Sequence, residues 1–123
     1  MACQLDKLVH EPIESLEQRI DIQKAARFMA ERNLGSVVVT EDDRVIGLFT
    51  ESDLIKRVVG PGKDPTSVTL GDAWCRNLVT IAADASCVEA IKTMHSNRCR
   101  RLLVYRDEKF LGVTTLPLVA RAM

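Results

Sequence analysis

The 123-residue chain is 46% hydrophobic, and its 17 basic and 17 acidic residues give a formal net charge of zero. A chain of this length can bury the core of one compact domain or of two small, closely joined ones. Because the charges balance, the sequence gives no sign of an extended basic surface for nucleic acid or an anionic membrane, so neither is an expected partner.

The sequence shows no pattern of a membrane span or of a secretory signal. Its apolar runs extend over a few residues, whereas a helix needs about 20 to cross a bilayer. The N-terminal segment MACQLDKLVHEP lacks the basic, then apolar, then small-residue order of a signal peptide. These features predict a cytoplasmic protein.

The cysteines and histidines are too irregularly spaced to predict a metal site. They are Cys3, Cys75, Cys87, Cys99, His10 and His95. No two cysteines form a Cys-x-x-Cys pair, and neither histidine lies at ligand spacing from them. We therefore expect no bound metal, and we expect reduced thiols that pack as small apolar residues.

The first half of the chain predicts a strand, an amphipathic helix, two strands and a helix. These elements lie at residues 14–16, 20–33, 36–39, 44–49 and from Thr50 onward. Ile22, Ala25 and Met29 recur at helical spacing in the first helix. An acidic turn joins the two later strands.

A linker and a second set of the same elements follow. The segment VGPGKDPTSVTLGDAW holds three glycines and two prolines, which indicates a linker. The second set lies at residues 78–81, 86–97, 102–105, 109–114 and from Thr115 onward. Asp84 and Ser86 are start signals for its first helix.

The two halves read as copies of one unit. When the chain is shifted by 65 residues, SVVVTEDDRVIGLFT lies over RLLVYRDEKFLGVTT without a gap. This pattern predicts a tandem duplication, with repeat 1 and the N-terminal segment at 1–59, a linker at 60–71 and repeat 2 at 72–123. One unit is too small for a solid core, so we expect an α+β fold in which two β-sheets face each other with helices outside.

The sequence resembles a tandem pair of cystathionine-β-synthase (CBS) domains, a Bateman module. The resemblance rests on ERNLGSVVVTEDDRVIG and VIGLFTESDLIKRVV in the first copy, and on LGDAWCRNLVTIAADASCVEAIKTM and NRCRRLLVYRDEKFLGVTT in the second. It covers roughly residues 8–123. It implies two βαββα repeats packed with pseudo-twofold symmetry, in a stand-alone CBS protein.

The resemblance also implies a regulatory function. Such modules bind an adenine nucleotide between the repeats, with AMP the leading ligand here and no obligatory cofactor. A Gly-apolar-x-Thr/Ser-x-x-Asp element holds the nucleotide, and in this chain it contains Gly47, Leu48, Thr50, Ser52 and Asp53. By this resemblance Asp53 accepts hydrogen bonds from both ribose hydroxyls, Thr50 donates to the phosphate, and Leu48 presents main-chain groups to the adenine.

Further contacts are implied near the strand starts. They are Gly35 and Ser36 in the first copy, and Thr80, Ile81, Cys99, Arg100 and Arg101 in the second. Arg101 is the expected phosphate clamp, because a guanidinium fork matches phosphate geometry. Residues 100 and 101 point to alternate sides on entering a strand, so one of them is expected to contact the ligand. The alternative for this basic cluster is a solvated turn balanced by nearby acids.

The second copy departs from the family pattern at one position. It reads GVTTLPL, so Leu118 stands where the first copy has Asp53. Without that carboxylate, only one of the two clefts is expected to be a full nucleotide site. Whether the other cleft binds a ligand stays open.

The Thr50–Asp53 stretch also has a purely structural interpretation. Thr50 as N-cap with Asp53 three residues later matches a capping box, and carboxylates favour the positive end of a helix. Judged by local pattern alone, the cap is favoured. The two interpretations are compatible, because a helix N-terminus is also an anion site. With the duplicated context added, the ligand role of Asp53 is favoured.

Three function classes follow from these patterns. The first is the nucleotide-binding regulatory module; the second is a ligand-free dimerisation or adaptor module for a partner enzyme. An enzyme is not expected, because the chain has no Ser/His/Asp set, no paired catalytic carboxylates and no Walker-type loop. A homodimer is expected. The identity of the nucleotide, the regulated partner and the dimer geometry stay open.

Overall fold

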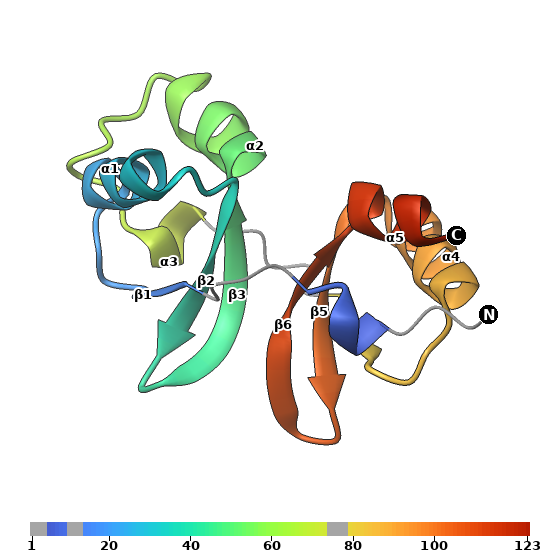
Figure 1. Ribbon diagram of the computed structural model, residues 1–123. Helices are drawn as coiled ribbons and strands as arrows, with labels where there is room; N and C mark the ends of the chain where they lie inside the picture. The colour runs from blue at the N-terminus through green and yellow to red at the C-terminus, as the bar shows by residue number, and fades with distance from the viewer. Residues whose placement is uncertain (1–4, 10–13, 74–78) are drawn as a thin grey trace. The chain divides into compact units, whose positions relative to one another are not determined.

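The computed structural model describes residues 5–9, 14–73 and 79–123, and it contains two three-stranded sheets with the same strand order. The chain divides into a first unit, Glu14–Leu78, and a second unit, Met1–Ile13 with Val79–Met123. Each unit runs strand, helix, strand, strand, helix, which confirms the predicted α+β fold built from two βαββα repeats (Figure 1).

The described residues of the first unit, 14–73, form three strands and four helical segments. They are β1 (Ser15–Glu17), α1 (Ile22–Arg32), β2 (Ser36–Glu41), β3 (Arg44–Thr50), α2 (Glu51–Asp53), the π-helical η2 (Leu54–Val59) and α3 (Leu70–Ala73). Strand β2 pairs in parallel with β1 and antiparallel with β3. Asp21 caps α1 by accepting a hydrogen bond from the Lys24 amide at 2.9 Å, and Asn33 ends the helix in the left-handed conformation.

The core of the first unit lies on one face of this sheet. Val37, Val39 and Phe49 alternate with residues that point to the other face, and α1 packs against them through its buried apolar side. Leu70 and Ala73 of α3 join the same core, and Figure 1 shows α1 and α3 on the same side of the strands. The end of the segment predicted as a linker is therefore part of the first unit's core.

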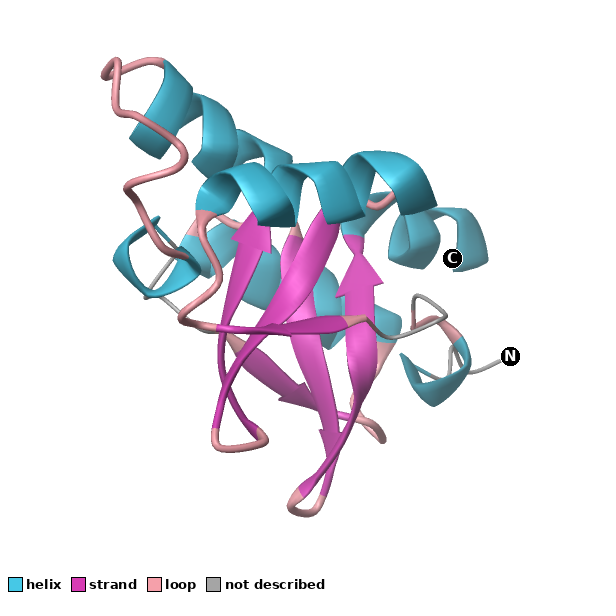
Figure 2. Ribbon diagram, turned by 90° about the vertical axis from the view of Figure 1, so that its left-hand side faces the viewer, coloured by secondary structure: helices cyan, strands magenta, loops and turns pink. Residues whose placement is uncertain are grey.

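The second unit repeats this arrangement. It contains η1 (Leu5–Lys7), β4 (Thr80–Ala82), α4 (Cys87–Asn97), β5 (Arg101–Arg106), β6 (Lys109–Thr115) and α5 (Leu116–Ala122). Ser86 is the N-cap of α4 and accepts from the Glu89 amide at 3.0 Å. In each unit the hairpin turn lies at one end of the strands, and the helix that follows the hairpin begins at the other end (Figure 2).

The N-terminal segment packs with the second repeat, whereas the sequence analysis placed it with the first. Leu5 is fully buried in the core that α4 and β5 build. The Thr114 hydroxyl donates to the Leu8 carbonyl at 2.8 Å, and Arg106 forms an ion pair with Asp6 at 2.8 Å. These contacts join residues about a hundred positions apart, so local sequence patterns could not reveal them.

The cysteines also differ from expectation. Cys87 is disulfide-bonded, although the spacing of the cysteines predicted reduced thiols. Cysteine pairing depends on which segments approach one another in space, and spacing along the chain does not give that. Cys3, Cys75 and His10 lie outside the described residues.

Candidate functional site

The predicted nucleotide element lies where β3 ends and α2 begins. Thr50 is the N-cap, in an extended conformation with φ −121° and ψ 166°. Its hydroxyl oxygen accepts a hydrogen bond from the Asp53 amide at 3.2 Å, and the Asp53 Oδ2 atom accepts from the Thr50 amide at 2.9 Å. The capping box predicted from the sequence is therefore formed.

Asp53 is one of two buried polar residues among those described, and it is 8% exposed. Besides the amide of Thr50, its Oδ2 atom accepts a hydrogen bond from the Thr50 hydroxyl at 3.0 Å. Its Oδ1 atom accepts from Arg57 Nε at 3.1 Å. The carboxylate is thus held in a fixed orientation from both sides.

The start of β2 lies beside this element. Ser36 is paired with Thr50 across the hairpin, and the Gly35 carbonyl accepts a hydrogen bond from the Glu51 amide at 3.1 Å. The structure therefore brings Gly35, Ser36, Thr50 and Asp53 together within the first unit. This grouping follows from hairpin register, because the start of one strand must meet the end of its antiparallel partner.

Gly47 is buried and pairs with Val39, and the other two residues of the element differ in placement. Leu48 is half-buried, pairs with Val38, and lies on the sheet face opposite to Phe49. Ser52 is exposed in the first turn of α2. Neither side chain takes part in the capping box.

The second unit carries the matching junction without the carboxylate. Thr115 caps α5 and accepts from the Leu118 amide at 3.4 Å, and Leu118 itself is half-buried. The Leu116 amide donates to the Arg100 carbonyl at 2.9 Å, which matches the bond between Glu51 and Gly35. The backbone of the junction is therefore conserved between the repeats, whereas the acceptor side chain is present in one repeat only.

Four of the five second-repeat residues predicted to contact a ligand line two separate hollows. Cys99 and Arg100 line a hollow of about 720 Å³ with Ile91, Met94, His95, Ser96, Arg98 and Leu116. Thr80 and Ile81 line another, of about 820 Å³, with Ala82, Ala83, Asp84, Tyr105, Arg106 and Asp107. Arg101 lines neither hollow and is paired with Thr115 across β5 and β6.

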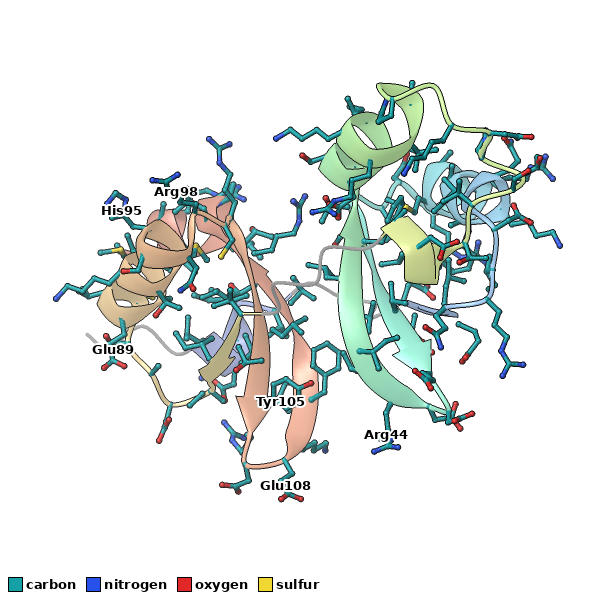
Figure 3. The ribbon with its side chains drawn as sticks, turned by 180° about the vertical axis from the view of Figure 1, so that it is seen from behind. Arg44, Glu89, His95, Arg98, Tyr105 and Glu108 are labelled. Atoms are coloured by element: carbon teal, nitrogen blue, oxygen red, sulfur yellow. The ribbon has the colours of Figure 1, made fainter. Side chains whose placement is uncertain are left out.

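Two arginines, Arg98 and Arg100, line the hollow beside Cys99. Figure 3 shows His95 and Arg98 projecting outward at the C-terminal end of α4, and Arg100 is also exposed. No acidic side chain is among the described lining residues. The sequence indicated the arginines as candidate ligand contacts but did not indicate His95. His95 lies one helical turn before Arg98, and its place beside the hollow follows only from where α4 ends.

The hollow beside Thr80 has mixed charge. Burial raises the pKa of Tyr105, whose ring packs against Phe110 with centroids 5.4 Å apart. The hydrogen bond from Arg106 holds the pKa of Asp6 below its ordinary value. Arg106 is therefore already engaged by the N-terminal segment.

Arg57 is the residue at the first-repeat site that the sequence analysis missed. A signal was present, since Arg57 follows Asp53 by four residues, the spacing at which an acid and a base meet on a helix.

Within residues 5–9, 14–73 and 79–123, no group of three or more His, Cys, Asp or Glu side chains is arranged to hold a metal ion. No helix in the same residues is both long and apolar enough to cross a bilayer.

Comparison with known proteins places these features in a family. The CBS-domain family model matches residues 5–60 and 75–122. An uncharacterised protein of Methanopyrus kandleri is 39% identical over 90 residues, which is 72% of this chain and 46% of that protein. This chain therefore spans about half the length of that relative.

Two further relatives extend the comparison. Hypoxic response protein 1 of Mycobacterium tuberculosis is 29% identical over 98 residues, covering 79% of this chain and 68% of that protein. The crystal structure of an uncharacterised conserved protein from Pyrococcus horikoshii matches with a TM-score of 0.89 and 29% identity, over 99% of this chain and 92% of that one. The chain belongs to the CBS-domain family and carries two CBS repeats.

Proposed function

We propose that this protein is a regulatory module that binds an adenine nucleotide, with AMP the leading ligand, through the β3–α2 junction of its first repeat. The observation that carries the proposal is the carboxylate of Asp53, which is 8% exposed and oriented by Thr50 and Arg57. The second repeat has the same junction with Leu118 in that position. One chain is therefore proposed to hold one nucleotide through a carboxylate.

The chemistry of a carboxylate suits it to bind the ribose of a nucleotide. An ionised carboxylate only accepts hydrogen bonds, and two neighbouring ribose hydroxyls can both donate to it. A carboxylate that is largely withdrawn from water forms stronger hydrogen bonds than an exposed one. The Thr50 hydroxyl donates its one proton to Asp53 Oδ2 at 3.0 Å, so in the proposed complex Thr50 orients the carboxylate and is not assigned to the phosphate. These roles are binding roles, and the proposal assigns no catalysis to the chain.

Asp53→Ala tests the proposal, with Asp72→Ala as its matched control. The Asp72 carboxylate is held in a similar way, because its Oδ2 atom accepts from the Thr69 amide at 3.2 Å and from the Thr69 hydroxyl at 3.0 Å. Both substitutions remove a helix-capping carboxylate, which costs about 1 kcal/mol. Only Asp53→Ala is expected to abolish nucleotide binding.

Thermal unfolding with AMP, ADP, ATP, NAD and S-adenosylmethionine supplies the measurement. A ligand present at ~100 times its dissociation constant adds about 2.7 kcal/mol of stability, which raises the midpoint by several degrees. We expect this shift in the parent and in Asp72→Ala, and none in Asp53→Ala. An equal shift in all three proteins would show that Asp53 is not the ligand residue.

A ligand-free adaptor is the second candidate, and a specific surface favours it. Ile55 and Val59 are 61% and 62% exposed, one helical turn apart on η2. Large apolar side chains exposed together are typical of surfaces that contact another protein. If no nucleotide raises the midpoint while light scattering shows a dimer at micromolar concentration, the adaptor function becomes the better account.

A further inference from the structure

Asp53 has few acceptor positions left for a ligand. Its Oδ2 atom accepts from the amide and the hydroxyl of Thr50, at 2.9 and 3.0 Å, and its Oδ1 atom accepts from Arg57 Nε at 3.1 Å. A carboxylate offers about four lone-pair positions, two on each oxygen. Three are taken, so one position on Oδ1 is open.

A ribose diol needs two acceptor positions, so one existing hydrogen bond must break when both hydroxyls bind. The two Thr50 bonds pair a part-buried backbone amide and hydroxyl, and breaking either would leave that donor without its partner. Arg57 is attached through a long, flexible side chain that is 48% exposed, so its guanidinium can move into water. The bond to Arg57 is therefore the one that can open with the least change elsewhere.

The second repeat shows that the Asp53–Arg57 pair is not needed to start a helix at this junction. Leu118 and Ala122 occupy the two matching positions in α5, and neither can form an ion pair. The α5 helix nevertheless begins at the same place, capped by Thr115. The acid and its basic partner are thus present together in one repeat and absent together from the other.

We propose that Arg57 is a latch on Asp53. In the free protein Arg57 occupies Oδ1, and it withdraws when the vicinal hydroxyls of a nucleoside bind to the carboxylate. It therefore lowers the affinity for the ribose and sets the ligand concentration at which the module responds. The latch rests on the proposed function, because it regulates the same carboxylate.

Arg57→Met tests the latch, and Lys56→Met is the matched control. Both substitutions remove one positive charge from adjacent exposed residues of η2, but only the first removes the partner of Asp53. Adenosine is the first probe, because it has a ribose diol and no charge. Isothermal titration of the full chain should show Arg57→Met binding adenosine more tightly than Lys56→Met by roughly two- to fivefold, the range that a half-exposed ion pair allows.

Salt supplies a second measurement that needs no variant. Added salt screens the Arg57–Asp53 attraction, so the parent protein should bind adenosine more tightly as salt rises. Arg57→Met should lose this dependence. AMP is titrated in the same way, with Lys56→Met correcting for the loss of one positive charge near the phosphate.

The outcomes separate the latch from the proposed function. If Asp53→Asn abolishes binding while Arg57→Met and Lys56→Met bind alike, the latch is wrong and the nucleotide site stands. Weaker binding by Arg57→Met alone would make Arg57 a ligand contact and would also overturn the latch. If Asp53→Asn binds as the parent does, or if no protein in the series binds either probe, the site and the latch are both rejected.

Discussion

The two strand-to-helix junctions of this chain share a backbone and differ in chemistry. At the end of β3, Thr50 and Asp53 cap α2 reciprocally, whereas at the end of β6 a single bond of 3.4 Å links Thr115 to the Leu118 amide. Both helices begin immediately after the threonine. The threonine is therefore sufficient to start the helix, and the buried carboxylate is an addition that helix formation does not explain.

The same two strands differ one residue earlier. Phe49 is fully buried in the core of the first unit, and the matching residue of the second unit is Thr114, also fully buried. Thr114 donates its hydroxyl hydrogen bond to the Leu8 carbonyl. Where the first unit completes its core with an aromatic side chain and α3, the second unit uses the N-terminal segment and a hydrogen bond.

The largest expected effect separates these two ways of completing a core. Phe49→Ala leaves a cavity under α1 and should lower the free energy of unfolding by about 3–5 kcal/mol. Thr114→Val keeps the shape of the side chain but leaves the Leu8 carbonyl without its hydrogen-bond donor. It should lower the free energy of unfolding by about 1–3 kcal/mol. Urea unfolding followed by circular dichroism measures both. A loss for Thr114→Val as large as that for Phe49→Ala would mean that the N-terminal segment contributes far more than one hydrogen bond.

A smaller change would make the second junction resemble the first. Leu118→Asp places a carboxylate three residues after Thr115 and should form a capping box, with a net stability change within about 1 kcal/mol. If the missing carboxylate is what separates the two repeats, isothermal titration should show the AMP stoichiometry rise from one toward two per chain. A stoichiometry that stays at one would show that other residues also distinguish the repeats.

The smallest expected effect is a pH dependence of the N-terminal segment in the second unit. The pKa of Asp6 is lowered by its hydrogen bond from Arg106, so the folded state favours the ionised form. The stabilisation by this pair is present above the ordinary aspartate pKa of 3.8 and is lost as the pH falls through the lowered pKa.

Hydrogen exchange at residues 5–9 measures this effect. The parent should protect these amides more than Asp6→Asn does at neutral pH, and the two proteins should converge in acid. The difference should be small, because the carboxyl is exposed and its attraction to Arg106 is screened by water. Equal protection at neutral pH would show that Leu5 and Leu8 hold the segment without the ion pair.

Much of the candidate site could be predicted from local sequence. The duplication, the hairpins and the threonine caps follow from residue periodicity and from hydrogen bonds between residues three positions apart, which the sequence displays directly. Gly35, Ser36, Thr50 and Asp53 come together because hairpin register requires it. Arg57 could have been found by the same local reasoning, since it lies one helical turn after Asp53.

The remainder depends on contacts between distant segments. The sequence by itself determined the βαββα order of both repeats and the capping box of Thr50 and Asp53, because these depend on neighbours along the chain. Only the tertiary structure decided that the N-terminal segment completes the second repeat, that α3 completes the first, and that Cys87 is disulfide-bonded. Apolar burial is non-directional, and an apolar segment such as that around Leu5 could fit several cores. The choice among them is made by shape and by single hydrogen bonds, such as the one between Thr114 and Leu8, that form only once both segments are in place.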